Sequence, residues 1–260
     1  MSEEPQRVDL AKLRVVYSVA GMESVPVRSN IEYAPGLTLD LYQPVETPAP
    51  VVVFVLGFPD PEGKYKETGP AVSWARLAAA SGMAAIVYAT REPATDLLAL
   101  LDFLRRHAAS LQIDATRIAL SASSGNGPCA LWSLMQPAHG LRCAVFQTAY
   151  LLDLDGKSVV AEAARTYGFA SPCAGKSLAN VRPDLPLFLT RAGRDQFTGL
   201  NESMDAFAVE ALRRNLPVSL VNHPEGPHGF ELFDNSETSR RIIRMILEFL
   251  RAHVMASPSR

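Results

Sequence analysis

The chain has 260 residues, a formal net charge of −2 and 48% hydrophobic residues. This length and apolar content allow a full core, and the balanced charge excludes the basic patches expected of proteins that bind nucleic acid or an anionic membrane surface. The first residues are polar and acidic, unlike a secretory signal, and no apolar run has the length of a membrane span. We therefore expect a cytoplasmic protein with no nucleic-acid or membrane partner.

The three cysteines, Cys129, Cys143 and Cys173, are an odd number without metal-ligand spacing. We interpret them as reduced thiols, and the sequence predicts no metal site.

The N-terminal part of the chain predicts strands at the edge of a sheet. A first strand is possible around residues 13–17. Residues 26–44 alternate between apolar and polar side chains and carry a Pro-Gly turn at Pro35 and Gly36. Leu37, Leu39 and Leu41 share one face, which predicts an antiparallel hairpin.

From residue 51 onward, apolar strands alternate with amphipathic helices. Strands are predicted at residues 51–56, 84–88, 117–120, 142–148, 186–190 and 218–222, and helices at 71–81, 93–109, 200–214 and 237–254, with a further helix beginning near Cys129. Such alternation predicts an α/β fold with a mostly parallel twisted sheet of about eight strands and helices on both faces. We expect a single domain over residues 1–260, with residues 149–184, which lack a strand period, as a small lid-like insertion.

The strand at residues 117–120 leads into the most informative stretch. Five small residues, 122–126, separate it from the next helix, and Ser123 and Ser124 lie at the turn. A sharp turn from strand to helix with a serine at its apex is the geometry of a nucleophile elbow. The N-terminal amides of the following helix favour negative charge at the same point.

Two other strand ends carry residues that can activate a serine. Asp195 follows the strand at 186–190, and His228 follows the strand at 218–222. A serine hydroxyl needs a base within hydrogen-bond reach, and a carboxylate can orient that base. Because the carboxyl ends of parallel strands meet at one edge of a sheet, the three residues are expected to converge. His223, at the end of its strand, is an alternative base.

These residues resemble the α/β-hydrolase fold, in particular its esterase and dienelactone-hydrolase-like branch, over residues 25–254. The family strand R-I-x-L-x-G-x-S-x-G-G matches residues 117–127, and its P-x-x-x-H-G-F turn matches residues 224–230. The resemblance implies Ser124 as nucleophile, Asp195 as acid and His228 as base. Ala122 and Asn126 replace the two glycines that flank the serine, and a second register makes Ser123 the alternative nucleophile.

The oxyanion loop departs from the family pattern. The family loop begins with His-Gly, whereas this chain reads Leu56-Gly57-Phe58-Pro59. The resemblance assigns the backbone N–H groups of Phe58 and Gly125 as the oxyanion donors, and Pro59 has no N–H to offer.

The sequence therefore predicts a serine hydrolase that cleaves small carboxylic esters through an acyl-enzyme, with a small-molecule ester and water as substrates and no cofactor. The unusual oxyanion loop keeps an alternative open, a catalytically silent hydrolase-fold protein that binds a small ligand or a partner. A thioester or a peptide bond is a further alternative. The sequence makes no prediction of acyl or alcohol specificity, or of oligomeric state.

Overall fold

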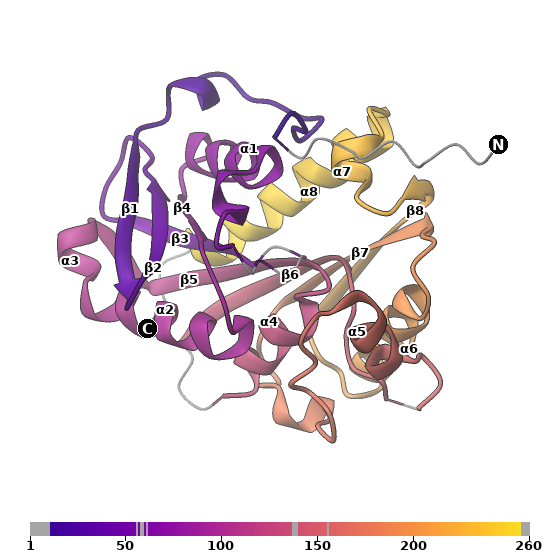
Figure 1. Ribbon diagram of the computed structural model, residues 1–260. Helices are drawn as coiled ribbons and strands as arrows, with labels where there is room; N and C mark the ends of the chain where they lie inside the picture. The colour runs from indigo at the N-terminus through magenta and orange to yellow at the C-terminus, as the bar shows by residue number, and fades with distance from the viewer. Residues whose placement is uncertain are drawn as a thin grey trace.

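A twisted eight-stranded sheet lies between helices in the computed structural model of the protein (Figure 1). The structure describes residues 11–55, 57, 60, 62–136, 140–154 and 156–255. The strands, in chain order, are β1 (Val27–Ala34), β2 (Leu37–Tyr42), β3 (Ala49–Val55), β4 (Ala84–Tyr88), β5 (Ile113–Ser124), β6 (Leu141–Ala149), β7 (Leu187–Arg194) and β8 (Val218–Pro227).

The helices are mostly amphipathic segments that lie between these strands or follow β8. They are α1 (Gly69–Ala80), α2 (Pro93–Arg106), α3 (Ala108–Leu111), α4 (Gly127–Leu134), α5 (Val160–Tyr167), α6 (Leu200–Arg213), α7 (Phe230–Phe233) and α8 (Glu237–Val254), with 3-10 turns η1 (Met22–Ser24), η2 (Tyr65–Glu67) and η3 (Leu178–Asn180). The predicted helices and the N-terminal hairpin are present with boundaries close to those expected from the sequence.

The spatial order of the strands is β1-β2-β4-β3-β5-β6-β7-β8. The hairpin strand β2 pairs antiparallel with β1 and with β4, whereas the strands from β3 to β8 pair in parallel. All residues of β3 and β4 are buried, as their continuous apolar runs predict for strands covered on both faces. The prediction of a mostly parallel α/β sheet of about eight strands is confirmed.

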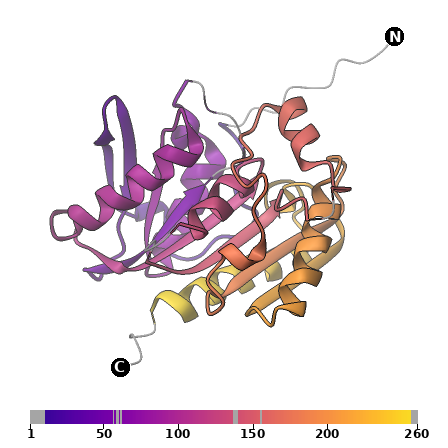
Figure 2. The same cartoon turned by 90° about the horizontal axis from the view of Figure 1, so that it is seen from below.

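The sheet divides the core into two layers. Helices α1 and α8 pack on one face, where Trp74 and Ile246 lie in the same apolar cluster as Phe54 of β3 (Figure 1). Helices α2, α4 and α6 cover the other face, where Leu100 and Phe207 are fully buried (Figure 2). This double coverage exposes the carboxyl ends of the parallel strands along one edge, where ligand sites of such sheets lie.

The strand expected at residues 13–17 is not formed. This stretch instead runs along α1 and α7: the Val15 amide donates a hydrogen bond to Ser73 Oγ at 3.1 Å, and the Val16 amide donates to the Glu231 carbonyl at 2.9 Å. Its backbone groups are therefore satisfied by helix-associated partners rather than by a neighbouring strand.

The segment at residues 149–184 begins at Ala149, the last residue of β6, and contains α5 and η3 but no further strand among its described residues. Tyr150 and Phe169 of this segment stack with their ring centroids 4.8 Å apart, and both belong to a small apolar cluster with Leu200 at the start of α6. The segment thus packs at the carboxyl end of the sheet. Its role as a lid, and the assignment of residues 1–260 to one domain, remain predictions.

None of the helices that the structure describes combines the length and the apolar character needed to cross a bilayer.

Candidate active site

The turn between β5 and α4 places Ser124 above the sheet edge. Ser124 is the last residue of β5 and has a φ of 47°, in the left-handed region that non-glycine residues rarely occupy. Its carbonyl accepts a hydrogen bond from the Tyr150 amide at 3.1 Å, and the Asn126 amide donates to the Ser123 carbonyl at 3.3 Å. These bonds hold a strained serine in place, as is common where strain supports function.

Close backbone approaches explain the small residues around this turn. A Cβ on Gly57 would lie 2.4 Å from the Ser124 Cβ, and a Cβ on Gly127 would lie 2.2 Å from the Tyr150 carbonyl oxygen. Both positions therefore require glycine. The end of β3 passes directly against the serine on one side, and the end of β6 passes against the start of α4 on the other.

His228 reaches Ser124 from the loop that follows β8. Its Nε2 lies 3.0 Å from Ser124 Oγ, within hydrogen-bond distance. Phe197 packs edge-on against the imidazole, with the ring centroids 4.5 Å apart. The His228 side chain is 13% exposed, so the ring is fixed by its neighbours but still reachable from the active-site side.

Asp195 holds the other side of the imidazole. It follows β7, its side chain is fully buried, and its Oδ2 lies 2.7 Å from His228 Nδ1. Its Oδ1 accepts a hydrogen bond from the Phe197 amide at 2.9 Å. Both carboxylate oxygens of Asp195 are therefore engaged, one by the imidazole of His228 and the other by the Phe197 amide.

The structure therefore brings together Ser124, His228 and Asp195 from the carboxyl ends of three strands. Ser123 also lines the neighbouring cavity, but the hydrogen bond of His228 goes to Ser124. His223 lies elsewhere: it is buried, and its Nε2 is 2.9 Å from Asp234 Oδ2 and 3.1 Å from Ser239 Oγ. His223 thus joins β8 to the start of α8 and is not the histidine beside the serine.

The two backbone groups expected to bind the oxyanion are the amides of Phe58 and Gly125. Phe58 lies outside the described residues. The Gly125 amide donates a hydrogen bond to the Gly57 carbonyl at 3.2 Å. An oxyanion that uses this amide must take the place of the Gly57 carbonyl.

A narrow cavity opens beside Ser124 and His228. Its volume is about 60 Å³. Since one water needs about 10–15 Å³ on this measure, the cavity has room for roughly four to six water-sized atoms. It is lined by Gly57, Tyr65, Pro70, Trp74, Ser123, Ser124, Gln147, Thr148, His228, Gly229, Glu231, Leu232 and Phe233.

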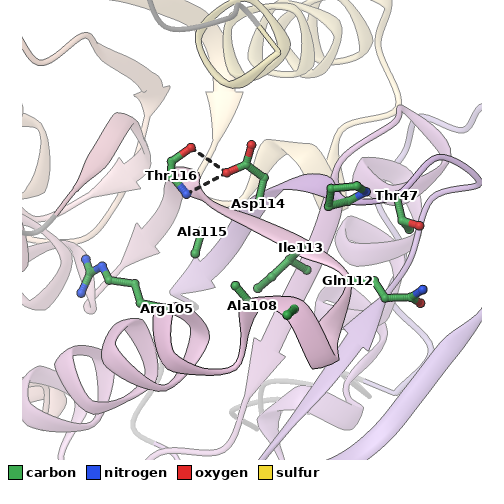
Figure 3. Close-up of a pocket in the computed structure, with 10 residues that line it drawn as sticks. Thr47, Arg105, Ala108, Gln112, Ile113, Asp114, Ala115 and Thr116 are labelled. Carbon is green, nitrogen blue, oxygen red and sulfur yellow. Dashed lines mark hydrogen bonds between the residues drawn. The ribbon is translucent and has the colours of Figure 1, made fainter.

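A larger hollow of about 810 Å³ lies at the opposite end of β5, near Ile113, Asp114 and Thr116 (Figure 3). The Asp114 carboxylate accepts hydrogen bonds from the amide and the hydroxyl of Thr116, at 2.9 and 2.6 Å. Ile113 begins the strand that Ser124 ends, so the hollow lies at the far end of β5 from the serine. Despite its size, this hollow belongs to the amino end of the strand and not to the triad.

Within the residues that the structure describes, no group of three or more His, Cys, Asp or Glu side chains has the arrangement of a metal site. The three cysteines are buried, and burial raises the pKa of each thiol to about 12.

Sequence reasoning missed several residues around the triad. Tyr65, Glu231 and Phe233 line the cavity, and the sequence did not single them out. A signal for Glu231 existed, since this acid lies among apolar residues directly after the His-Gly-Phe turn. No local pattern marks Tyr65, which reaches the cavity from η2.

Comparison with known proteins gives the fold. No protein-family model matches the chain, and no curated protein matches it in sequence. Among solved structures, esterase 2 from Thermogutta terrifontis bound to butyrate superposes with a TM-score of 0.68 at 19% identity, covering 92% of this chain and 98% of the other. Esterase LipW from Mycobacterium marinum gives a TM-score of 0.71 at 19% identity, covering 88% of this chain and 82% of the other.

A third similar structure is described as an alpha/beta hydrolase. MGS-M1, an alpha/beta hydrolase enzyme from a Medee basin deep-sea metagenome library, superposes with a TM-score of 0.66 at 16% identity, covering 89% of this chain and 99% of that one. The chain has the α/β-hydrolase fold. The α/β-hydrolase elbow accounts for the positive φ of Ser124 and for its position between β5 and α4. The narrower resemblance to dienelactone hydrolases remains a prediction.

Proposed function

We propose that this protein is a serine hydrolase that cleaves small carboxylic esters, with Ser124 as nucleophile, His228 as general base and Asp195 as the residue that orients His228. The observation that carries the proposal is the continuous hydrogen-bonded chain from Ser124 Oγ through the imidazole to the buried Asp195 carboxylate. A serine hydroxyl that shares its proton with an oriented imidazole has the activation that acyl transfer requires.

The reaction follows from this geometry in two halves. Ser124 Oγ attacks the ester carbonyl carbon while its proton moves to His228 Nε2. The bond to the alcohol oxygen then breaks, and the proton on Nε2 passes to the leaving alcohol. In the second half, water gives a proton to Nε2 and its oxygen attacks the acyl-Ser124 carbonyl. The carboxylic acid leaves, and Ser124 Oγ recovers the proton.

The negative charge of each tetrahedral intermediate needs donors near Ser124. The Gly125 amide, at the approach to the N-terminus of α4, is the proposed donor from the elbow, and Phe58 supplies the second in this proposal. The chemistry of the proposed mechanism uses only the side chains and amides of the chain, with water as the second substrate.

The related structures support an ester as substrate. Esterase 2 from Thermogutta terrifontis has been solved with butyrate bound, and also phosphonylated by sarin. The small cavity beside Ser124 is compatible with acyl or alcohol groups of comparable length. We therefore favour short carboxylic esters over thioesters or peptides. We also favour catalysis over a silent ligand-binding role, because such a role does not require a serine paired with a buried His-Asp couple.

The decisive experiment combines hydrolysis with covalent labelling. Wild-type protein should hydrolyse p-nitrophenyl acetate and butyrate and should react with a fluorophosphonate probe, with the adduct located on Ser124 by peptide mass spectrometry. Ser124→Ala should lower kcat by roughly 10³-fold or more and abolish labelling. Ser123→Ala is the matched control, since it removes the neighbouring hydroxyl from the same turn.

Two results would contradict the proposal. Full activity in Ser124→Ala with loss in Ser123→Ala would move the nucleophile to Ser123. A wild-type protein that neither hydrolyses esters nor reacts with the probe would favour the silent binding module.

A further inference from the structure

The cavity beside the triad contains a carboxyl group that the mechanism does not use. Glu231 belongs to α7, three residues after His228, and only 6% of its surface is exposed. Its Oε2 is buried and has no hydrogen-bond partner among the described residues. A buried polar atom without a partner costs about 1–3 kcal/mol, so such an atom calls for an explanation.

Two other buried carboxylates among the described residues, Asp40 and Asp195, have polar partners. Asp40 accepts hydrogen bonds from Lys66 Nζ at 3.0 Å and from the Asn30 amide at 2.8 Å. Asp195 uses both of its oxygens, as described above. Glu231 differs from them, because its Oε2 is buried and has no partner among the described residues. Glu231 also lines the cavity beside Ser124 and His228, where a bound molecule would supply the missing partner.

The surroundings of Glu231 indicate what that partner is. Trp74, Leu232 and Phe233 give the cavity mostly apolar walls, while His228 and Ser124 lie at its reactive end. Burial raises the pKa of the Glu231 carboxyl, and the hydrogen bond from its own backbone amide and the nearby His228 oppose that rise only in part. Either form of the carboxyl retains an oxygen that accepts a hydrogen bond. The terminal torsion of a glutamate is broad, so the carboxyl group can adjust its orientation to a bound molecule.

We propose that Glu231 is a specificity-determining residue that accepts a hydrogen bond from a hydroxyl or ammonium group on the part of the ester that enters this cavity. The inference rests on the proposed esterase function and deepens it, because it names the chemical class of the substrate: short esters with a hydrogen-bond donor near the end of the chain. A purely alkyl chain of the same size leaves the carboxyl unpaired. Sites built to bind a polar group discriminate strongly against analogues that lack it.

The test compares three ethyl esters whose acyl groups have the same number of non-hydrogen atoms: butyrate, 3-hydroxypropionate and β-alaninate. A second pair varies the alcohol, with the acetates of 1-propanol and ethylene glycol. For each ester, kcat/KM is measured for the wild type, Glu231→Leu and Glu231→Gln. The matched controls are Glu225→Leu and Glu225→Gln, which alter an exposed glutamate three residues before His228.

The expected result is a change in preference rather than a uniform loss. Glu231→Leu should lower the ratio of kcat/KM for the donor-bearing ester over its alkyl partner by roughly tenfold or more in at least one series, because leucine offers no acceptor. Glu231→Gln separates the two donors, since its amide oxygen still accepts from a hydroxyl but carries no charge for an ammonium. The Glu225 variants should keep the wild-type ratios.

The outcomes distinguish this inference from the proposed function. If Glu231→Leu lowers kcat/KM equally for all the esters, Glu231 is not a specificity residue. The same conclusion follows if the kcat/KM ratios of both Glu231 variants match those of the Glu225 variants in both ester series. In either case the proposed esterase function is unaffected. If wild-type protein hydrolyses none of these esters or the p-nitrophenyl esters, the proposed function fails, and this inference fails with it. If Glu231→Leu does not fold, the near-isosteric Glu231→Gln still provides the test, through its kcat/KM ratio for the β-alaninate ester over the butyrate ester.

Discussion

The carboxylate of Asp195 accepts a hydrogen bond from Nδ1 of His228 at 2.7 Å, although 33 residues separate the two along the chain. The contact forms because β7 and β8 are parallel neighbours whose pairing continues to Arg194 and Pro227, directly before each residue. A Cβ on Gly193 would lie 2.2 Å from the Pro224 carbonyl oxygen, so the two strand ends approach closely only with glycine there.

We expect Asp195→Asn to lower kcat for ester hydrolysis by about 10⁴-fold with little loss of folding, because the amide can stabilise the wrong tautomer of His228. Stopped-flow or long-time hydrolysis assays, together with circular dichroism, measure both effects. Asp184→Asn is a matched control, since that carboxylate is 73% exposed and precedes β7. Unchanged kcat in Asp195→Asn would show that this carboxylate does not serve the reaction.

Gly57 offers a test of the packing around the elbow. A Cβ at this position would lie 2.4 Å from the Ser124 Cβ and 2.6 Å from the Ser123 carbonyl oxygen. We expect Gly57→Ala to displace Ser124, to lower kcat/KM at least tenfold and to destabilise the fold by about 1–3 kcal/mol, the usual cost of overpacking. Urea unfolding and ester hydrolysis check the two effects.

Gly156→Ala is the control for the Gly57 variant. A Cβ there meets no atom within 4 Å, but its φ of 69° strains any other residue. It should lower stability by about 1 kcal/mol without changing hydrolysis. Equal effects of the two substitutions on activity would remove Gly57 from the explanation of the site.

A buried ion pair stabilises the fold beside the hairpin. Lys66 Nζ lies 3.0 Å from Asp40 Oδ1 and 2.9 Å from Asn30 Oδ1, and the Lys66 and Asp40 side chains are 4% and 9% exposed. Removing one partner leaves a buried charge without compensation. Lys66→Met should therefore reduce the free energy of unfolding by about 3–5 kcal/mol.

The neighbouring exposed pair provides the control for this prediction. Lys64 and Glu62 also form an ion pair, at 2.8 Å, but about 70% of each side chain is exposed. Lys64→Met should change the free energy of unfolding by less than about 1 kcal/mol. Denaturant unfolding of both variants makes the comparison, and equal destabilisation by the two would contradict it. Adding Asp40→Leu to Lys66→Met should recover part of the loss.

The fold could be predicted from the sequence in segments where a single hydrophobic periodicity dominates. The strands β3 to β7 each contain a run of buried, mostly apolar residues, and α8 has a strong apolar stripe, so their identities could be predicted. The strand expected at residues 13–17 fails because Val15 and Val16 find partners in Ser73 and Glu231, which no local pattern indicates. Long-range partners decide whether such short apolar stretches become strands.

Part of the candidate site could likewise be predicted from the sequence, and part could not. Ser124, Asp195 and His228 follow strands, and parallel strands place such residues at one edge, so their proximity could be expected from the sequence. The walls of the cavity could not, because Tyr65, Trp74 and Glu231 come from η2, α1 and α7, whose relative positions depend on packing. The bond between the Gly125 amide and the Gly57 carbonyl likewise depends on how the β3 and β5 ends meet.

The cysteines should be chemically silent in the folded protein. Cys129, Cys143 and Cys173 are buried, and burial raises each thiol pKa to about 12, so the reactive thiolate is scarce at neutral pH. Ellman's reagent should titrate almost no thiol in the native protein at pH 8 and all three in guanidinium chloride. Rapid reaction of a native thiol would show that its side chain is accessible, and iodoacetamide should leave esterase activity intact.

Asp234 should make stability depend on pH in the acid range. Hydrogen bonds from Ser236 Oγ, Ser239 Oγ and His223 Nε2 converge on its Oδ2 and lower its pKa below the ordinary value of 3.8. Because the folded state favours the carboxylate, the resulting stability is complete above the unfolded pKa and is lost as the pH falls through the folded value.

Asp234→Asn removes this titration but keeps a side chain of similar shape. Its free energy of unfolding should be lower than that of the wild type near pH 7, and the difference should shrink as the pH falls below about 4, because the wild-type carboxylate then becomes protonated. Urea unfolding at a series of pH values from 7 to 3 measures the difference. The matched control is Asp184→Asn, an exposed carboxylate, whose difference from wild type should stay small throughout. A constant difference between Asp234→Asn and wild type across this range would mean that the Ser236, Ser239 and His223 contacts do not favour the charged form.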